Sequence, residues 1–512
     1  SNFLGVDGPY SSPIVSTATV VSAPVNAAAP FSNLSAGGLT FSWGSGGNGA
    51  GTDYNPWIST SSDFSAPVSS DVTTSLNYVF TGLSANTTYY GRVRAIGEGG
   101  APTNYTGTVS TVTYTLAPEI PASPFTAVGT GGFTFSWNTG GNPPNTRYAA
   151  EISRDNFVNL IASASTLALS AGFTGLAPNT VYQARAKALN FLGVEGPYSS
   201  PLRSTATLAM VPSNTSPSFT AVSAATLTFT WAEGGNPGGT SYTVELSSAG
   251  FAPDTAISSA ATLALSRTFA GLLANTTYYG RVKAVNMDNV PSVYSSSVPV
   301  VTLPLAPAMA SPPFGAVNSS SFTLSWTAGG NPQSTTYVAE ISLDNFVTVP
   351  ISSTTLNLQA AFTDLTPNTT YTARVKAVNF AGETGPYSSP FVSTAALAVP
   401  PQSAVSSFTL TDAGLTVQWS AGGNPSGTRY EAEVSTRPDF APLWSSAAVA
   451  GVSAGFTLAA NTTYYARIRA RNHNGIPTAD LELGSEITYA ALPAVSASTT
   501  TGLVSVTTFS FT

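Results

Sequence analysis

Leu365-Thr-Pro-Asn-Thr-Thr-Tyr-Thr-Ala-Arg-Val-Lys-Ala377 decides the fold of this chain, because close relatives of this stretch recur along the whole sequence. Each copy begins with a turn in which Pro or Ala precedes Asn-Thr, and continues as a run that alternates apolar and polar residues. Such alternation is typical of a half-buried β-strand. The strands begin at Tyr89, Tyr182, Tyr278, Tyr371 and Tyr464. The recurring element is therefore a strand and not a catalytic loop.

A second landmark is a tryptophan about 45 residues before each of these tyrosines. The five tryptophans are Trp43, Trp137, Trp231, Trp326 and Trp419, and neighbouring positions differ by 94, 94, 95 and 93. Units of this size contain many short strands and Gly or Pro turns. A core tryptophan and a tyrosine at the start of a late strand favour a β-sandwich in each unit.

The order of these landmarks resembles a known family. Trp, then Tyr on the next strand, then Leu-x-Pro-x-Thr-x-Tyr-x-x-Arg-x-Lys-Ala is similar to the fibronectin type III pattern, here as tandem repeats of a bacterial extracellular type. The resemblance implies an all-β, seven-stranded sandwich with each tryptophan on strand B and each tyrosine on strand F. It implies little about function, because such modules are used as spacers, adhesive units and receptor parts.

The sequence predicts five complete units in an elongated array. Their predicted limits are residues 21–116, 117–209, 210–303, 304–398 and 399–491. Residues 1–20 match the last strand or strands of a unit, and residues 492–512 match the first strands of another. We therefore expect either a segment of a longer repeating chain or ends that another molecule completes. Proline lies in each connection between units, which predicts semi-rigid joints.

Two kinds of unit alternate along the chain. The first, third and fifth units carry Ala-Asn-Thr-Thr-Tyr-Tyr, whereas the second and fourth carry Pro-Asn-Thr and then Gly-Pro-Tyr-Ser-Ser-Pro. Trp43 and Trp231 are 188 residues apart, as are Trp231 and Trp419. The repeat is therefore a pair of units, and this register favours an end-to-end periodic assembly or a truncated segment of one.

The amino-acid composition limits the classes of function that this chain can have. Charged residues make up 8% of the chain and the net charge is −7, which argues against nucleic acid as a partner because phosphates require basic patches. Cysteine is absent, which fits a bacterial surface protein in oxidising surroundings. No run of 18 apolar residues occurs, so no membrane span is expected in this segment.

Strands C and F carry opposite charges at matching positions. Alternation turns a glutamate on strand C outward in four units and basic residues on strand F outward in all five. The glutamates are Glu151, Glu245, Glu340 and Glu433, and the first basic residues are Arg185, Arg281, Arg374 and Arg467. Strands C and F are neighbours in this fold, so these residues are expected to form exposed cross-strand pairs worth roughly 0.2 to 1 kcal/mol each.

Two tryptophans outside the core are candidate partner contacts. Trp57 occupies the strand C position that holds glutamate in the other units, opposite Arg92. It is expected either to stack on that arginine or to contact a partner. Trp444, which precedes strand E in the fifth unit, is either local filler or part of an interface.

The remaining polar motifs predict turns rather than chemistry. His473 is the only histidine and lies in an F–G turn, so at most one Ser/His/Asp triad could form. One aspartate recurs before a Phe in most units, at Asp63, Asp155, Asp344 and Asp439. Asn-Thr-Thr at Asn86, Asn275, Asn368 and Asn461 formally fits a glycosylation acceptor, but its place predicts an E–F turn. Gly-Gly-Asn after each tryptophan predicts a B–C turn. No catalytic, cofactor or metal site is expected.

Two functions follow from these observations. The first is a non-enzymatic structural protein that forms an extracellular fibre, stalk or sheath by self-association, end to end or laterally. The alternative is an adhesin or glycan-contacting spacer with a functional head elsewhere, whose partners are glycans or other surface proteins. A spacer arm of a large secreted enzyme is a third option.

Overall fold

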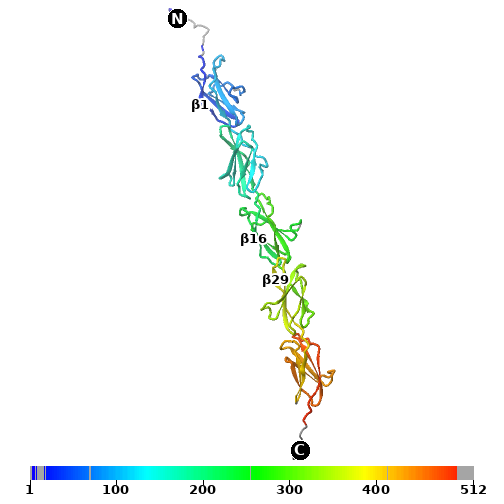
Figure 1. Cartoon of the computed structure of the whole chain (residues 1–512). Coiled ribbons are helices and arrows are strands. Elements are labelled where there is room, and N and C mark those ends of the chain that lie inside the picture. The colour runs from blue at the N-terminus through cyan, green and yellow to red at the C-terminus, as the bar shows by residue number, and fades with distance from the viewer. Residues whose placement is uncertain are drawn as a thin grey trace, which may run out of the picture.

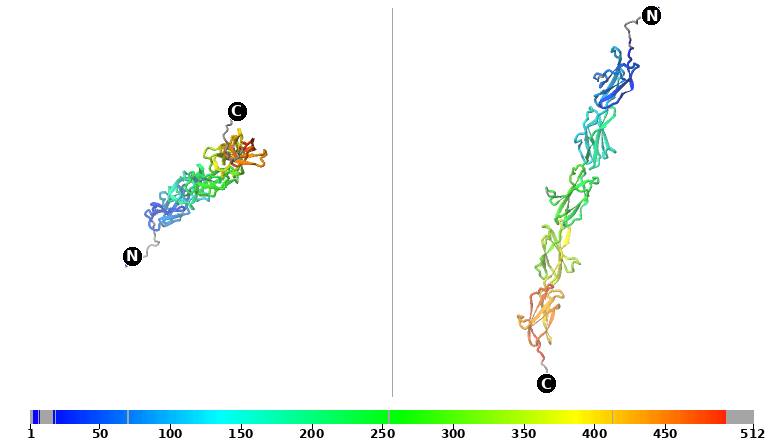
Figure 2. Two further views of the ribbon diagram at one scale, coloured as in Figure 1. Left: turned by 90° about the horizontal axis from the view of Figure 1, so that it is seen from below. Right: turned by 180° about the vertical axis from the view of Figure 1, so that it is seen from behind.

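The chain folds as five β-sandwiches that follow one another end to end. A computed structural model describes residues 3–5, 7, 17, 19–68, 71–253, 255–411 and 413–492. Figure 1 and Figure 2 show an elongated array in which the N-terminal and C-terminal parts lie at opposite ends. The described residues contain strands and turns but no helix. This confirms the predicted all-β class with tandem sandwiches.

The predicted limits of the five units stay predictions. The incomplete units predicted at residues 1–20 and 492–512 fall mostly outside the described residues.

Each unit contains two antiparallel sheets. The smaller sheets, with strands A, B and E, are β1-β2-β5, β8-β9-β12, β16-β17-β20, β23-β24-β27 and β31-β32-β35. In the larger sheets the strands lie in the order C′, C, F, G. These sheets are β4-β3-β6-β7, β11-β10-β13-β14, β19-β18-β21-β22, β26-β25-β28-β29 and β34-β33-β36-β37. This is the sheet arrangement that the family resemblance implies.

The strand limits repeat closely from unit to unit. The first unit contains β1 (Val25–Ser32), β2 (Gly38–Gly44), β3 (Asp53–Ser59), β4 (Pro67–Val68), β5 (Asn77–Thr81), β6 (Thr88–Ile96) and β7 (Val109–Val112). The second contains β8 (Phe125–Thr126), β9 (Gly132–Ser136), β10 (Arg147–Ser153), β11 (Leu160–Thr166), β12 (Ser170–Thr174), β13 (Val181–Leu189), β14 (Glu195–Tyr198) and β15 (Arg203–Ala206). The third contains β16 (Ser213–Thr220), β17 (Thr226–Ala232), β18 (Ser241–Ser247), β19 (Ala256–Ser258), β20 (Ser266–Ala270), β21 (Thr277–Val285) and β22 (Val298–Val301).

The last two units follow the same plan. The fourth contains β23 (Ala308–Gly315), β24 (Phe322–Thr327), β25 (Thr336–Ser342), β26 (Ile351–Thr355), β27 (Gln359–Phe362), β28 (Thr370–Val378), β29 (Thr384–Tyr387) and β30 (Val392–Ala395). The fifth contains β31 (Gln402–Thr411), β32 (Gly414–Ser420), β33 (Arg429–Ser435), β34 (Ser445–Val449), β35 (Ser453–Thr457), β36 (Thr463–Arg471) and β37 (Leu481–Ile487).

The alternation of units appears in strand G. In the second and fourth units this strand is divided into two pieces, β14 with β15 and β29 with β30, and both pieces pair with strand F. The Ser-Ser-Pro segment lies between the pieces. Proline has no N–H for the sheet ladder, so Pro201 and Pro390 interrupt the strand.

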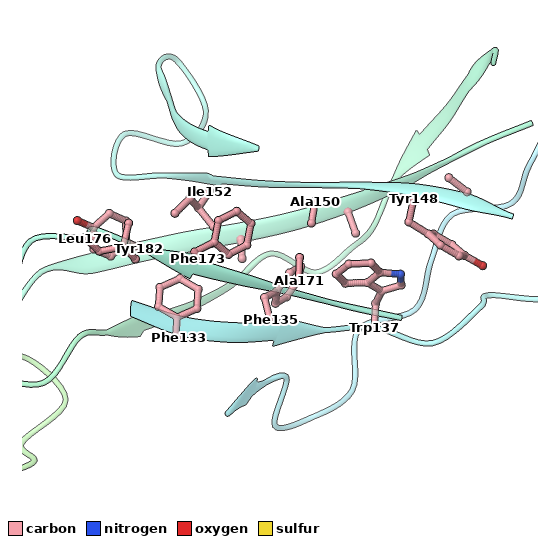
Figure 3. Close-up of a cluster of buried hydrophobic side chains, with 13 residues drawn as sticks. Phe133, Phe135, Trp137, Tyr148, Ala150, Ile152, Ala171, Phe173, Leu176 and Tyr182 are labelled. Atoms are coloured by element: carbon pink, nitrogen blue, oxygen red, sulfur yellow. The ribbon is translucent and has the colours of Figure 1, made fainter. Parts of the chain in front are cut away.

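Each sandwich encloses its own hydrophobic core. Figure 3 shows the core of the second unit, where Trp137, Tyr148 and the phenylalanines of β9 and β12 lie between the sheets. Trp137 is 2% exposed, and its ring centroid lies 5.9 Å from that of Tyr148. The same tryptophan–tyrosine contact recurs in every unit, which confirms the predicted core position of the five tryptophans.

The tyrosine at the start of strand F holds the preceding turn. The Tyr371 hydroxyl accepts a hydrogen bond from the backbone N–H of Thr366, with N and O 3.0 Å apart. Equivalent hydrogen bonds form at the other four tyrosines. Each E–F turn is therefore fastened to the core of its own unit.

The glutamate–arginine pairs form in the predicted register, but the prediction that they are exposed is wrong. Glu151 lies opposite Arg185, and the arginine Nε donates to Glu151 Oε2 at 2.9 Å. Glu151 is only 6% exposed, because Tyr198 of β14 and the arginine cover it. Parity along a strand predicts which face a side chain occupies, but it does not predict what covers that face.

Candidate functional site: the joints between units

The asparagine of each E–F turn lies where two consecutive units meet. Asn179, in the turn between β12 and β13, has a φ of 43° and is 2% exposed. Asparagine tolerates this left-handed conformation better than most residues. Since Tyr182 fastens the turn to the core, the Asn179 side chain is presented to the next unit in a fixed position.

Both ends of the Asn179 amide bond to that next unit. Asn179 Nδ2 donates to Thr240 Oγ1 at 2.8 Å, and Asn179 Oδ1 accepts from the backbone N–H of Met287 at 2.8 Å. The first and third joints repeat this pair of contacts. There, Asn86 bonds to Thr146 and Phe191, and Asn275 bonds to Thr335 and Phe380.

A second asparagine, in the F–G loop, bonds in the opposite direction. Asn286 Oδ1 shapes its own loop by accepting from the N–H groups of Asp288 and Val290. Its Nδ2 donates to the carbonyl oxygen of Thr207 in the preceding unit at 3.2 Å. Equivalent donors at the other joints are Asn190, Asn379 and Asn472. Each joint is therefore bonded from both sides.

The Gly-Gly-Asn turn holds the connecting segment. Asn236 accepts from the N–H of Met210 at 2.7 Å and donates to the Met210 carbonyl at 2.8 Å. Gly234 has a φ of 69°, and a Cβ there would lie 2.4 Å from the carbonyl oxygen of Val211. The turn therefore requires glycine both for its backbone conformation and for the close approach of the connection. The predicted B–C turn is confirmed, and its contact with the connection is an added finding.

The fourth joint departs from this pattern. Asn368 Nδ2 donates to Thr428 Oγ1 at 2.9 Å, but the buried Asn368 Oδ1 has no hydrogen-bond partner among the described residues. His473 stands where the other joints have Phe or Met. Its Nδ1 lies 3.1 Å from Thr370 Oγ1 of the preceding unit. The predicted turn position of His473 is confirmed, and its contact across the joint was not predicted.

The two candidate partner contacts lie in different units and not in one site. Trp57 is on β3, and its Nε1 donates to Asn55 Oδ1 at 2.7 Å. Trp444 lies directly before β34, which is strand C′, and is 54% exposed, with its ring in a T-shaped contact with that of Tyr464. Their role as partner contacts stays a prediction.

The recurring aspartates shape turns. Asp155 accepts from the backbone N–H and the side chain of Asn159 and from Ser153, and these hydrogen bonds lower its pKa to about 2. The Ser342 hydroxyl, together with Thr348, lowers the pKa of Asp344 to about 2. The carboxylates are therefore committed to local hydrogen bonds.

The Asn-Thr-Thr asparagines have two environments. Asn86, Asn275 and Asn368 are 0% exposed, because the next unit covers them. Asn461 is exposed.

In the described part of the chain, no group of three or more histidines, aspartates or glutamates is arranged to hold a metal ion. The described residues include no helix that is long and apolar enough to cross a bilayer.

Comparison with known proteins gives a family for one unit directly. Residues 311–394 match the model of the fibronectin type III domain. No curated protein matches the chain. Among solved structures, the FN1–FN3 domains of chicken CNTN1 align at 17% identity over 55% of this chain and 100% of that one, with a TM-score of 0.19. The match to residues 311–394 lies in the fourth unit, and the other four units share its sheet order and core. The chain is a tandem array of fibronectin type III-like domains.

Proposed function

We propose that this chain is a non-enzymatic structural protein, a segment of a long tandem-repeat chain that forms an extracellular or cell-surface fibre, stalk or sheath. Tandem arrays of this fold have structural or adhesive roles and are typically non-catalytic. The proposal of a fibre, stalk or sheath rests on the hydrogen bonds at the joints between units. An asparagine that donates and accepts across the first three boundaries, and donates across the fourth, resists rotation more than a flexible linker does, because bending breaks buried hydrogen bonds.

Self-association, end to end or lateral, is the proposed partner interaction. Charged residues are costly to bury at the centre of an interface, and they make up only 8% of this chain. The surface is carried mainly by small polar and apolar residues, so lateral contact costs little desolvation of charge. The absence of cysteine supports an extracellular location, where oxidation of free thiols would otherwise occur.

Stiffness is tested by changing four joints together. Asn86, Asn179, Asn275 and Asn368 are replaced by glycine, which keeps the left-handed turn but removes the bonds that these four side chains make across the joints. The matched control is Asn461→Gly, which changes the same turn in a unit whose asparagine is exposed. Small-angle X-ray scattering is expected to show an extended wild type and control and a more compact, flexible quadruple variant. Equal scattering profiles for all three would refute the role of the joints.

Assembly is tested by electron microscopy of the native material. Regular polymers with a repeat that matches two units are the expected result. Dispersed chains that bind glycans would refute the fibre and support an adhesin or glycan-contacting spacer in its place.

A further inference from the structure

The first unit lacks an ion pair that the other four units share. In those units a strand C glutamate lies opposite a strand F arginine, and the arginine Nε donates to the carboxylate at 2.6 to 2.9 Å. In the first unit Trp57 of β3 lies opposite Arg92 of β6, so the carboxylate is missing. A second arginine, Arg94, follows on the same face, opposite Asn55.

The two arginines have donors without acceptors. The Nε atoms of Arg92 and Arg94 are buried and make no hydrogen bond among the described residues. The ion pairs of the described chain are made by other residues. Buried N–H donors of a charged group cost free energy when they are left without an acceptor. In the other four units the arginine equivalent to Arg92 has its Nε satisfied by a carboxylate, so a carboxylate is the group that this face lacks.

Aromatic rings hold the Arg92 guanidinium in place. Its Cζ lies 3.8 Å from the ring centroid of Phe64 and 4.1 Å from that of Tyr105, whereas Trp57 is farther away, at 5.7 Å. The local stack predicted for Arg92 therefore involves Phe64 and Tyr105 more closely than Trp57. These two close ring contacts restrain the guanidinium, which prepares it for a planar carboxylate.

The rings beside the arginines also indicate the kind of molecule that carries the carboxylate. Trp57 and Tyr105 are only partly buried, and their centroids are 5.8 Å apart. Aromatic rings at a partly exposed site offer flat apolar surface with little loss of conformational entropy on binding. A pyranose ring has apolar C–H groups that fit such a surface, and a uronic acid adds the carboxylate.

We propose that the face of the first unit formed by Trp57, Arg92, Arg94 and Tyr105 binds an acidic saccharide through its carboxylate. The carboxylate accepts hydrogen bonds from the two guanidinium groups, and the sugar ring packs against the aromatic side chains. This site goes beyond the structural role and does not depend on polymer formation, since every residue in it belongs to one unit.

The test is isothermal titration calorimetry, in which the full chain is titrated with oligogalacturonate. The wild type is expected to bind this probe, and its methyl ester, which has no negative charge, is expected not to bind. The double change Arg92→Gln with Arg94→Gln is expected to weaken binding by about tenfold or more, because hydrogen bonds to a charged group are lost. Circular dichroism confirms that this variant is folded.

A second variant separates binding from folding. Trp57→Glu restores the carboxylate of the other units, so it is expected to weaken binding about tenfold or more without lowering the melting temperature. The control changes Glu340→Gln and Arg374→Gln together, which removes the corresponding pair of the fourth unit, and binding is expected to be unchanged.

Three results would overturn the proposal. These are no binding of oligogalacturonate by the wild type at about 10 mM, equal binding by the double arginine variant, or binding of hexaglutamate in place of the saccharide. The last result would assign the face to an acidic protein partner. None of these results bears on the stiffness of the array, which is measured by scattering.

Discussion

Replacing Asn179 by glycine is the sharpest test of the joints. The change keeps the backbone conformation, since glycine adopts a φ of 43° without strain. It removes the hydrogen bond from Asn179 Nδ2 to Thr240 and the one from Met287 N–H to Asn179 Oδ1. Everything that fastens the turn within its own unit, including the bond to Tyr182, remains.

The magnitude follows from these contacts. Each hydrogen bond contributes about 0.5 to 1.5 kcal/mol, and leaving the part-buried Met287 N–H without its acceptor adds about 1 kcal/mol. Thr240 loses less, because its hydroxyl still donates to the carbonyl of Pro237. The free energy of opening the second joint should therefore fall by about 2 to 4 kcal/mol, which corresponds to a factor of about 30 to 700 in the opening equilibrium.

Hydrogen exchange measures this opening. The backbone N–H of Met287 exchanges when the joint opens, so its protection is expected to fall by about 30- to 700-fold in the variant, while amides in the core of the third unit keep theirs. Asn461→Gly controls for the general effect of glycine in this turn. Protection of Met287 within about threefold of the wild type would refute the reasoning, as would an equal loss in the control.

Three further predictions concern the fourth joint, the buried ion pairs and the turns. The F–G loop of the fifth unit should lose protection before its equivalents, since Asn368 Oδ1 has no partner, and equal protection at all four joints would contradict this. Glu340→Ala should lower the unfolding free energy of the fourth unit by roughly 2 to 4 kcal/mol in denaturant titration, because Arg374 keeps a partly buried charge without its partner, whereas an effect below about 1 kcal/mol would show that the pair is solvated. The chain should lose stability as the pH falls from about 4 to 2, because local hydrogen bonds lower the folded pKa values of Asp155 and Asp344 to about 2, below the ordinary value of 3.8. Their contribution to stability is complete above the unfolded pKa and is lost as the pH falls through the folded pKa. The measurement is the thermal midpoint of the double variant Asp155→Asn, Asp344→Asn between about pH 4 and 2. If this midpoint depends on pH as strongly as that of the wild type, the assignment is contradicted.

The elements that depend on local pattern could be predicted from the sequence. Strand parity and the recurrence of tryptophan and tyrosine are enough to place Trp137 and Tyr182 in the core of a sandwich. The division of strand G also has a local signal, since Pro201 interrupts the sheet ladder. These features are determined within one unit by residues close in the chain or in register on neighbouring strands.

The joints could not be predicted in the same way, because they bring together residues of different units. Asn179 is 61 residues from Thr240 and 108 residues from Met287. One signal was present, since an asparagine recurs in every E–F turn although only its backbone conformation is required there. The covering of Arg92 by Phe64 also has a signal, because a phenylalanine follows the C-strand turn in each unit.

The exposed Asn461 shows how a joint can form at small conformational cost. Its φ is 47°, equal to that of Asn368, which the next unit covers completely. Tyr464 fastens its turn as Tyr371 fastens the other. The turn therefore has the same shape whether its asparagine is covered or exposed, and docking of a unit orders only the amide side chain. Since binding groups that are already in place lose little entropy on association, modest hydrogen bonds are enough to keep successive units aligned.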